Sequence, residues 1–555
     1  MKTKYILPIL LVVLLGGMVS CKKELLKMNE NPNGADPNTT NPNMVFSTVL
    51  SEAGKAFVDL GYQDIAGVMQ HTQKDGWADG HNAYDWGGSN SWANYYNILR
   101  NNQYVYDRAV ELDYTFHQGA SLVMKSLMFG LITDLWGDAP YSHALKGAEE
   151  GRENRFPAYD TQQSIYEGIL ADLEEANNIL SGSVTGSPGS SDIYFGGNVM
   201  KWRRFANSLA LRYYMRLSEK MPAVAKEGIE RIVNNPTKYP IITNAADDVA
   251  MGFPGNNNGD SWPSNATYDT DSTNYRRIKM AQPLVGKMLE YNDPRLSVYA
   301  NRVQIPIQVD ETLPTGTDRI VTMTINGEQR RVRQVHPSVF PAGVTVNDIN
   351  QHPDYVGLPL GLPLPYTYNL SPNQTQSSRN PHVSWVNSAF ANAKSGIKAR
   401  IISAAEVNFI LAEASAVYGW NAGNATTHYN NAIQASFTAW NLGNAAQYLA
   451  QPNVVFNGSQ EQILTQKWIA SWSVAAEAWF DWRRTGLPRL QGATAQGVLP
   501  VRFYYPLDER NLNGANAQAA IDRLQATSID DPWSGGTKNS IWAKPWIIQG
   551  TGKPF

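Results

Sequence analysis

The side chains best suited to bind a ligand are concentrated between residues 75 and 90. Aromatic rings alternate there with carboxylates, an amide and a histidine, in a segment punctuated by glycine: Asp75, Trp77, Asp79, His81, Tyr84, Asp85, Trp86 and Asn90. An aromatic ring stacks on the C–H face of a sugar, and carboxylates and amides form hydrogen bonds with its hydroxyl groups. We therefore predict that this segment, the 75–90 loop, binds a saccharide between helices that end near Lys74 and begin near Trp92. The competing interpretation is that its rings pack the loop onto those helices.

A second turn-rich segment carries a similar mixture of rings and carboxylates. It contains Trp262, Tyr268, Asp269, Asp271 and Tyr275. Such a segment would close over a ligand held by the 75–90 loop. Trp262 and Tyr268 are therefore predicted as further ligand contacts.

A metal site is a weaker interpretation of the same region. His71, Asp75, Asp79 and His81 are residue types that bind metals, but their spacing matches no standard ligand pattern. His71 and Asp75, four residues apart, would also form a pair on one helix. We predict no metal and no cofactor, with calcium held by the acidic loop oxygens as an unspecific alternative.

The sequence contains no motif that indicates an enzymatic function. Glycoside hydrolysis needs two carboxylates that converge across a bond, and nothing in the spacing of the 49 acidic residues selects such a pair. A Gly-x-Ser-x-Gly nucleophile elbow and a phosphate-binding glycine loop are both absent from the sequence. We predict a binding protein, and a lipid-anchored glycoside hydrolase remains the less favoured alternative.

Cys21 is the only cysteine, and it directly follows the only strongly apolar run. Lys2 and Lys4 precede that run, Ile6 to Leu15, as they do in a secretory signal. The run is shorter than the roughly 20 apolar residues that span a bilayer. We predict a signal peptide at residues 1–20 and lipid attachment at Cys21. The alternative is an ordinary signal peptide cleaved elsewhere, which would leave a free thiol.

The charge of the chain argues against binding to nucleic acid. Loss of residues 1–20 removes two lysines and no acidic residue, so the formal charge changes from −3 to −5. A nucleic-acid-binding protein instead needs a basic face that displaces counterions from phosphates. The 16 tryptophans and 27 tyrosines, in a chain with 17% charged residues, favour buried cores or a ring-lined binding surface.

The elements that must position the candidate sites fall into blocks. Residues 21–43 are rich in Asn, Pro and Thr and predict a flexible tether, and residues 44–555 form the folded domain. Within it, helical patterns occupy about 44–235 and 401–490, a loop and β insertion occupies about 236–400, and 491–555 is rich in loops. In the insertion, strands 320–325 and 331–335 flank Asn326-Gly327, which predicts a hairpin with a primed turn.

Helical periodicity is clearest in four segments. One helix contains the apolar stripe Trp202, Phe205, Leu209, Tyr213 and Leu217, and another begins at Asp160 and Gln163 and contains Ile165, Ile169, Leu173 and Ala176. A third begins with a capping box, Ser403 to Glu406, and ends at Gly419; a fourth runs from Thr427 to about Trp440. Short connections between such helices predict antiparallel pairs like those of helical repeat proteins.

Several segments resemble SusD/RagB-type outer-membrane lipoproteins of Bacteroidota, in the order that the family has them. They are 197–212 (GNVMKWRRFANSLALR), 292–296 (NDPRL), 406–414 (EVNFILAEA), 463–469 (ILTQKWI), 477–486 (EAWFDWRRTG) and 504–506 (YYP) with Glu509 and Asn511. The segment 355–361 (YVGLPLG) resembles the SusD-like subgroup. The resemblance covers most of the mature chain.

The resemblance implies a fold, a location and a function. The fold is mainly α, with four tetratricopeptide-like helix pairs and a loop-rich face. The implied protein is lipid-anchored on the cell surface at the outer membrane. It binds oligosaccharides, or in some members peptides, and delivers them to a SusC-type TonB-dependent transporter. In the family, ligand contacts lie in the region that corresponds to the 75–90 loop.

The charged residues of the family signature are better explained as framework. Glu477, Asp481, Arg483 and Arg484 lie within two turns of one helix, so ion pairs between residues three or four apart account for them. Arg203, Arg204, Asn207 and Arg212 receive the same interpretation. We therefore expect a non-catalytic glycan-binding lipoprotein, with a peptide-binding member of the same family as the main alternative.

Overall fold

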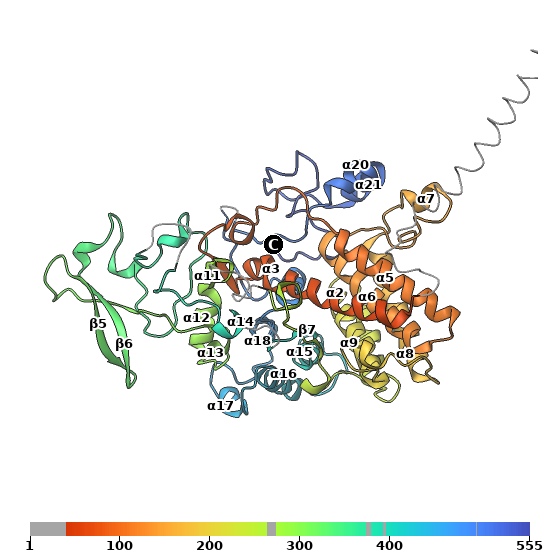
Figure 1. The fold of residues 1–555 in the computed structure, drawn as a ribbon, viewed down its shortest axis with the longest axis horizontal. Coiled ribbons are helices and arrows are strands. Elements are labelled where there is room, and N and C mark those ends of the chain that lie inside the picture. The colour runs from red at the N-terminus through yellow and green to blue at the C-terminus, as the bar shows by residue number, and fades with distance from the viewer. Residues whose placement is uncertain (1–39, 264–272, 373–378, 392–395, 495–496) are drawn as a thin grey trace, which may run out of the picture.

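The computed structural model describes residues 40–263, 273–372, 379–391, 396–494 and 497–555. Most of its regular structure is α-helical, and the strands form small sheets of two or three (Figure 1). The predicted mainly α fold with a small-sheet insertion is therefore confirmed. Among the described helices, none has both the length and the apolarity to cross a bilayer. The predicted signal peptide and Cys21 lie outside the described residues.

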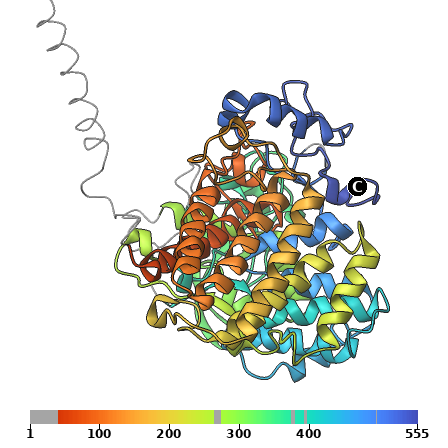
Figure 2. The same cartoon turned by 90° about the vertical axis from the view of Figure 1, so that its right-hand side faces the viewer.

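The first helical block contains long helices, which pack against their neighbours in the chain, and, among the described residues, three short ones (Figure 2). Its helices are α2 (Pro42–Tyr62), α3 (Asp64–Val68), α4 (Asp79–Asn82), α5 (Ala93–Glu111), α6 (Thr115–Trp136), α7 (Arg152–Arg155), α8 (Gln162–Ser181), α9 (Val199–Arg216) and α10 (Pro222–Val233). The most deeply buried is α6, which is covered nearly all round. At its Gly130, an added Cβ would lie 1.9 Å from the Tyr213 hydroxyl oxygen, so glycine lets α9 approach closely.

The start of α2 corrects the predicted end of the tether at residue 43. The Asn41 side chain accepts a hydrogen bond from the Asn43 amide at 2.9 Å, and Pro42 occupies the first helical turn. Asparagine is a favoured N-cap, and proline at the first position already has the helical φ. Asn41-Pro42-Asn43 is thus a helix start rather than a turn.

The predicted apolar stripes of α8 and α9 are buried. In α8 these are Ile165, Ile169, Leu173 and Ala176, and in α9 they are Trp202, Phe205, Leu209 and Tyr213, with Leu217 directly after the helix. The start of α8 differs slightly from the prediction, because Thr161 caps it by accepting from the Ser164 amide at 3.2 Å. Asp160 instead accepts from the amides of Tyr141 and Ser142.

The second helical block packs against α9. It contains α15 (Ala404–Ala416), α16 (Ala425–Ala439), α17 (Ala446–Leu449), α18 (Gln460–Ala470) and α19 (Ala475–Thr485). Only half of the predicted capping box forms. Ser403 accepts from the Glu406 amide at 3.2 Å, but the Glu406 carboxylate binds Arg212 at 2.6 and 2.7 Å. A buried guanidinium on α9 competes successfully with the N-cap amide, since a charged pair is the stronger hydrogen bond.

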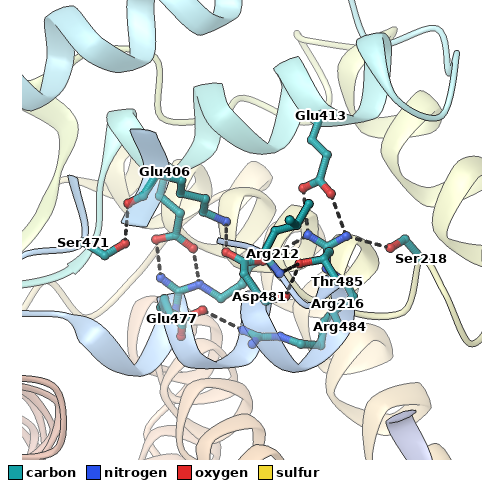
Figure 3. A network of polar contacts seen from close by, with 12 residues as sticks. Arg212, Arg216, Ser218, Glu406, Glu413, Ser471, Glu477, Asp481, Arg484 and Thr485 are labelled. Carbon is teal, nitrogen blue, oxygen red and sulfur yellow. Dashed lines mark hydrogen bonds and ion pairs between the residues drawn. The ribbon is translucent and has the colours of Figure 1, made fainter. Parts of the chain in front are cut away.

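The signature charges form a buried network between helices (Figure 3). Arg484 of α19 makes two bonds to Glu413 of α15, at 2.7 and 2.8 Å, and Glu477 of α19 lies 2.6 Å from Arg216 of α9. The framework interpretation is confirmed, but the pairing within one helix is mostly wrong. One predicted pair within α19 is present in the described structure: Arg484 and Asp481, three residues apart, form an ion pair of 3.1 Å. The network joins α9, α15 and α19 into one unit.

Apart from β1, the strands lie between the two helical blocks, together with several short helices. Strand β1 (Thr72–Lys74) pairs antiparallel with β3 (Ile278–Met280), and β2 (Val249–Met251) pairs antiparallel with β7 (Ala399–Ile402). The three-stranded sheet has the order β4 (Ile307–Val309), β6 (Glu328–Val335), β5 (Asp318–Ile325). The helices here are α11 (Thr273–Arg277), α12 (Gln282–Glu290), α13 (Leu296–Tyr299) and α14 (Ser388–Ala391).

The predicted hairpin is confirmed. Strands β5 and β6 are joined by Asn326 and Gly327, whose φ angles are 50° and 83°. Two positive φ values define the primed turn whose twist matches that of the strands.

The C-terminal segment is partly core. It contains α20 (Leu507–Leu512) and α21 (Gly514–Arg523). Before them, the amide of Phe503 donates to the carbonyl of Leu135 at 2.7 Å, and Tyr504 and Tyr505 are buried. Phe503 and Tyr504 also contact Trp86 and Asn90, so this segment lies beside the 75–90 loop.

Candidate ligand-binding site

The 75–90 loop is held by a strand and a closed turn rather than by two flanking helices. Strand β1 occupies 72–74, and α3 ends at Val68, so the predicted helix ending near Lys74 is wrong. Asn82 closes the turn by accepting from the Lys74 amide at 2.9 Å and donating to the Lys74 carbonyl at 2.8 Å. The following helix, α5, begins at Ala93, close to the predicted position.

Two of the predicted ligand contacts are buried charged or titratable groups. Asp75 lies 3.0 Å from the ammonium of Lys279 on β3, and both side chains are at most 1% exposed. Burial lowers the pKa of Lys279, while the Asp75 carboxylate opposes that shift. His81 is 2% exposed and its Nε2 lies 3.1 Å from the Thr72 hydroxyl. Burial also lowers the pKa of His81, while the Asp64 carboxylate, 3.8 Å from its Nδ1, opposes that shift. Asp75 and His81 are therefore buried residues that hold the loop in place, not exposed ligand contacts.

His71 belongs to the same support. It lies outside any helix, so the predicted helical pair with Asp75 is wrong. Its Nε2 lies 3.0 Å from the carbonyl of Trp468, and burial lowers its pKa to about 4. Across the described residues, no group of three or more His, Cys, Asp or Glu side chains is arranged to hold a metal ion.

Three further loop residues fasten it to the C-terminal segment. Tyr84 is buried and its hydroxyl accepts from the Ala493 amide at 3.2 Å. Burial raises the pKa of Tyr84 to about 12. Trp86 is half-buried, edge-to-face with Phe503 at 4.8 Å, and its indole donates to the Gly80 carbonyl. Asn90 accepts from the Tyr504 amide at 2.9 Å. Tyr84, Trp86 and Asn90 therefore pack the loop onto the rest of the protein, as the competing interpretation of this loop expected.

Trp77, Asp79 and Asp85 remain on the surface. Trp77 is 74% exposed, and the guanidinium of Arg277 lies 5.6 Å from its ring centre. Its backbone has a φ of 54°, which is unusual for a large residue. Asp79 and Asp85 are both exposed. The surface therefore retains one ring and two carboxylates of the predicted site.

Trp533 is a candidate that the sequence analysis did not identify. It is 50% exposed and lies against the loop, since a Cβ added at Gly88 would be 3.2 Å from the Trp533 Cβ. Its amide donates to Asp531 at 3.0 Å, and Asp531 also accepts from the Tyr504 hydroxyl. All 16 tryptophans lie in the described residues, and only Trp77 and Trp533 are exposed. The turn-forming residues around Trp533, in the segment 531–536 (DPWSGG), could have indicated from the sequence that its ring lies on a surface loop.

The second predicted segment does not form a surface site in the described residues. Trp262 is fully buried and packs on Tyr62 and Phe390, with ring centres 5.3 and 5.8 Å away. Tyr275 is also buried, and its hydroxyl donates to the Val386 carbonyl. Trp262 is thus a core residue rather than a ligand contact. Tyr268, Asp269 and Asp271 lie outside the described residues.

A separate cavity of about 660 Å³ lies where α9, β7 and α16 meet. Lys201, Asp248, Arg400 and Trp440 line it, and the Arg400 guanidinium lies 4.7 Å from the Trp440 ring centre. Burial raises the pKa of Asp248 to about 6. The size suits a small ligand. It contains none of the predicted site residues, so it provides an alternative location for a ligand.

Comparison with known proteins supplies the family context. The model of the SusD-like family, described as starch-binding and associating with the outer membrane, matches residues 36–311 and 336–506. No curated protein sequence matches the chain at a significant level.

The fold is similar to solved structures. One is a candidate nutrient-binding outer-membrane protein of Bacteroides vulgatus, with 23% identity and a TM-score of 0.69 over 92% of this chain and 100% of that one. Another is a SusD homologue of Bacteroides fragilis, with 21% identity and a TM-score of 0.68 over 92% and 100%. A third is a chitin-binding SusD homologue of Flavobacterium johnsoniae, with 20% identity and a TM-score of 0.66 over 91% and 99%.

Proposed function

The chain belongs to the SusD-like family, and on that premise we propose that it is a non-catalytic, lipid-anchored protein of the outer membrane that binds oligosaccharides on the face containing Trp77. In this proposal it delivers the ligand to a SusC-like TonB-dependent transporter. Its family, described as starch-binding, supports a glycan ligand, as does the chitin-binding relative of the same fold.

The observation that carries the proposal is the exposure of Trp77. Ten of the tryptophans are buried, and the loop that carries Trp77 is itself well anchored. An indole left in water forgoes the stabilisation that burial would give. A ring held exposed on a fixed support can stack on the apolar face of a ligand. Arg277 beside the ring, with Asp79 and Asp85, supplies hydrogen-bonding groups for hydroxyls.

Delivery would follow from a lid-like arrangement. A ligand that contacts both this chain and the transporter stabilises the closed pair, because it binds that state more tightly than the open one. The buried supports Asp75, His81 and Tyr84 keep the ring-bearing surface fixed while the two proteins move. No step of this process requires bond cleavage.

Replacing Trp77 with alanine is expected to weaken oligosaccharide binding by about 5- to 150-fold, which corresponds to about 1 to 3 kcal/mol for an aromatic contact. Folding stability should hardly change, because the ring is 74% exposed. Calorimetric titration with a panel of starch- and chitin-derived oligosaccharides measures the affinity, and thermal melting measures the stability.

Val455→Ala is the control, since Val455 is 53% exposed and lies in the segment between α17 and α18, outside the 75–90 loop. Unchanged affinity in Trp77→Ala would reject this surface. Loss of binding on Arg400→Gln would then move the site to the 660 Å³ cavity. Binding of peptides but not of glycans would favour the peptide-binding alternative, and turnover of a polysaccharide would favour the hydrolase.

Lipid attachment is proposed at Cys21, which follows the predicted signal peptide. Cys21→Ser should move the protein from the membrane fraction to the soluble fraction without affecting its fold. The reason is that a multiply acylated cysteine anchors stably, whereas a folded body alone has no such anchor. Fractionation followed by immunoblotting measures this. Ser20→Ala keeps Cys21 and should stay in the membrane, and an unchanged distribution of Cys21→Ser would reject the anchor.

A further inference from the structure

The β5–β6 hairpin is an addition to the family domain. The family model leaves residues 312–335 unmatched, and this gap contains β5, Asn326-Gly327 and β6. In Figure 1 the hairpin projects at the left, away from the helical blocks. A role of the hairpin would therefore be additional to that of the domain that the family model matches. It does not depend on the glycan-binding proposal.

Ion pairs hold the hairpin in one conformation. The guanidinium of Arg333 on β6 makes two 2.8 Å bonds to Asp318 on β5. Arg330 bonds to Asp354 at 2.8 Å and to the Pro353 carbonyl at 2.8 Å, which ties the tip to the body. The register from 318↔335 to 325↔328 is continuous, without a bulge. The hairpin therefore presents a straight and well-defined outer strand.

The outer strand, β5, has one free edge. The sheet order is β4-β6-β5, and among the described residues β5 pairs with β6 alone. Alternate residues along its other side direct N–H and C=O groups outward. Native proteins normally protect such an edge with lysine, proline, a bulge or an inward charge. From Ile320 to Ile325 the edge has none of these, and Ile320 is 48% exposed.

We propose that this edge pairs with the same edge of a second copy of the chain. A two-fold axis perpendicular to the sheet makes two identical strands antiparallel and preserves both faces. With the axis at Thr322, Ile320 lies opposite Thr324 of the second copy, and Val321 lies opposite its Met323. Thr322 meets its own equivalent. The two three-stranded sheets become one sheet of six strands.

The charge distribution favours a second copy as the occupant. Residues 320–325 carry no charge, so no like charges meet in the centre of the pairing. Arg319 lies opposite Ile325, and Asp318 lies beyond the paired stretch, bonded to Arg333. Cross-strand pairs of threonine and of β-branched residues are favourable. The contact involves only one short strand from each copy, so a weak and concentration-dependent dimer is expected.

Position 322 provides the test, because the axis places it opposite itself. Soluble mature protein with Cys21→Ser should form dimers in sedimentation equilibrium as its concentration rises. Thr322→Lys and Thr322→Glu should each weaken self-association by about tenfold or more, since like charges then face one another across the axis. An equimolar mixture of the two variants should dimerise again. The side chain of Thr322 is exposed, so both variants should keep the wild-type melting temperature.

Two controls complete the experiment. Thr322→Cys in the Cys21→Ser background should cross-link with a short bismaleimide, whereas Thr426→Cys on α16, also exposed, should not. A protein that stays monomeric at every concentration would overturn the proposal. So would a dimer that both charged variants retain, because that dimer would use another surface.

Discussion

Arg484→Met is expected to lower the free energy of unfolding by about 3 to 5 kcal/mol, because it leaves a buried carboxylate without its cation. Arg484 and Glu413 are 2% and 0% exposed at their side chains, and two hydrogen bonds of 2.7 and 2.8 Å join them. Arg484 also bonds to Asp481, Ser218 and Tyr418, so its loss disturbs α15 and α19 together (Figure 3). Urea unfolding followed by circular dichroism measures the change.

The surface pair Lys226 and Glu230, whose side chains are 50% and 23% exposed, is the control for Arg484. These residues lie four apart on α10 with a 2.6 Å contact, and Lys226→Met should change the stability by about 0.5 kcal/mol or less. The double variant Arg484→Met, Glu413→Leu should recover much of the loss, since an apolar pair needs no counter-charge. A loss below about 1 kcal/mol for Arg484→Met alone would contradict the framework role.

Trp262→Ala is expected to destabilise the fold by about 3 to 5 kcal/mol while leaving the affinity of the correctly folded protein for oligosaccharide unchanged. The ring is fully buried among Tyr62, Phe253 and Phe390, so alanine leaves a cavity that the surrounding aromatic side chains fill only partly. Thermal melting and calorimetric titration below the melting temperature separate the two effects. Trp262→Phe retains a ring and should have a smaller effect on stability.

The pair Trp262 and Trp77 thus gives opposite outcomes from the same chemical change. Alanine at 262 should reduce stability and spare binding, and alanine at 77 should do the reverse. Weaker binding by Trp262→Ala with an unchanged melting temperature would contradict this prediction. The Trp262 ring would then contact the ligand, and it would have to be exposed when the ligand binds.

The sequence by itself determined the elements whose signals are local. The stripes of α8 and α9, the start of α15 at Ser403 and the primed turn at Asn326-Gly327 all depend on residues within a few positions of one another. Backbone hydrogen bonds in helices and tight turns have that same short range, so spacing and residue type suffice. The spacing of the charges on one helix also predicted that Arg484 and Glu477 are framework residues, although their main partners, Glu413 and Arg216, lie on other helices.

Only the tertiary structure decided which side chains face solvent and which partners they take. Trp77 and Trp262 have similar turn-rich surroundings in the sequence, yet one is 74% exposed and the other fully buried. Glu406 binds Arg212, 194 positions away, instead of its own helix start, and Asn90 binds Tyr504 across 414 positions. Burial and pairing depend on which elements pack together in space, and no local pattern contains that information.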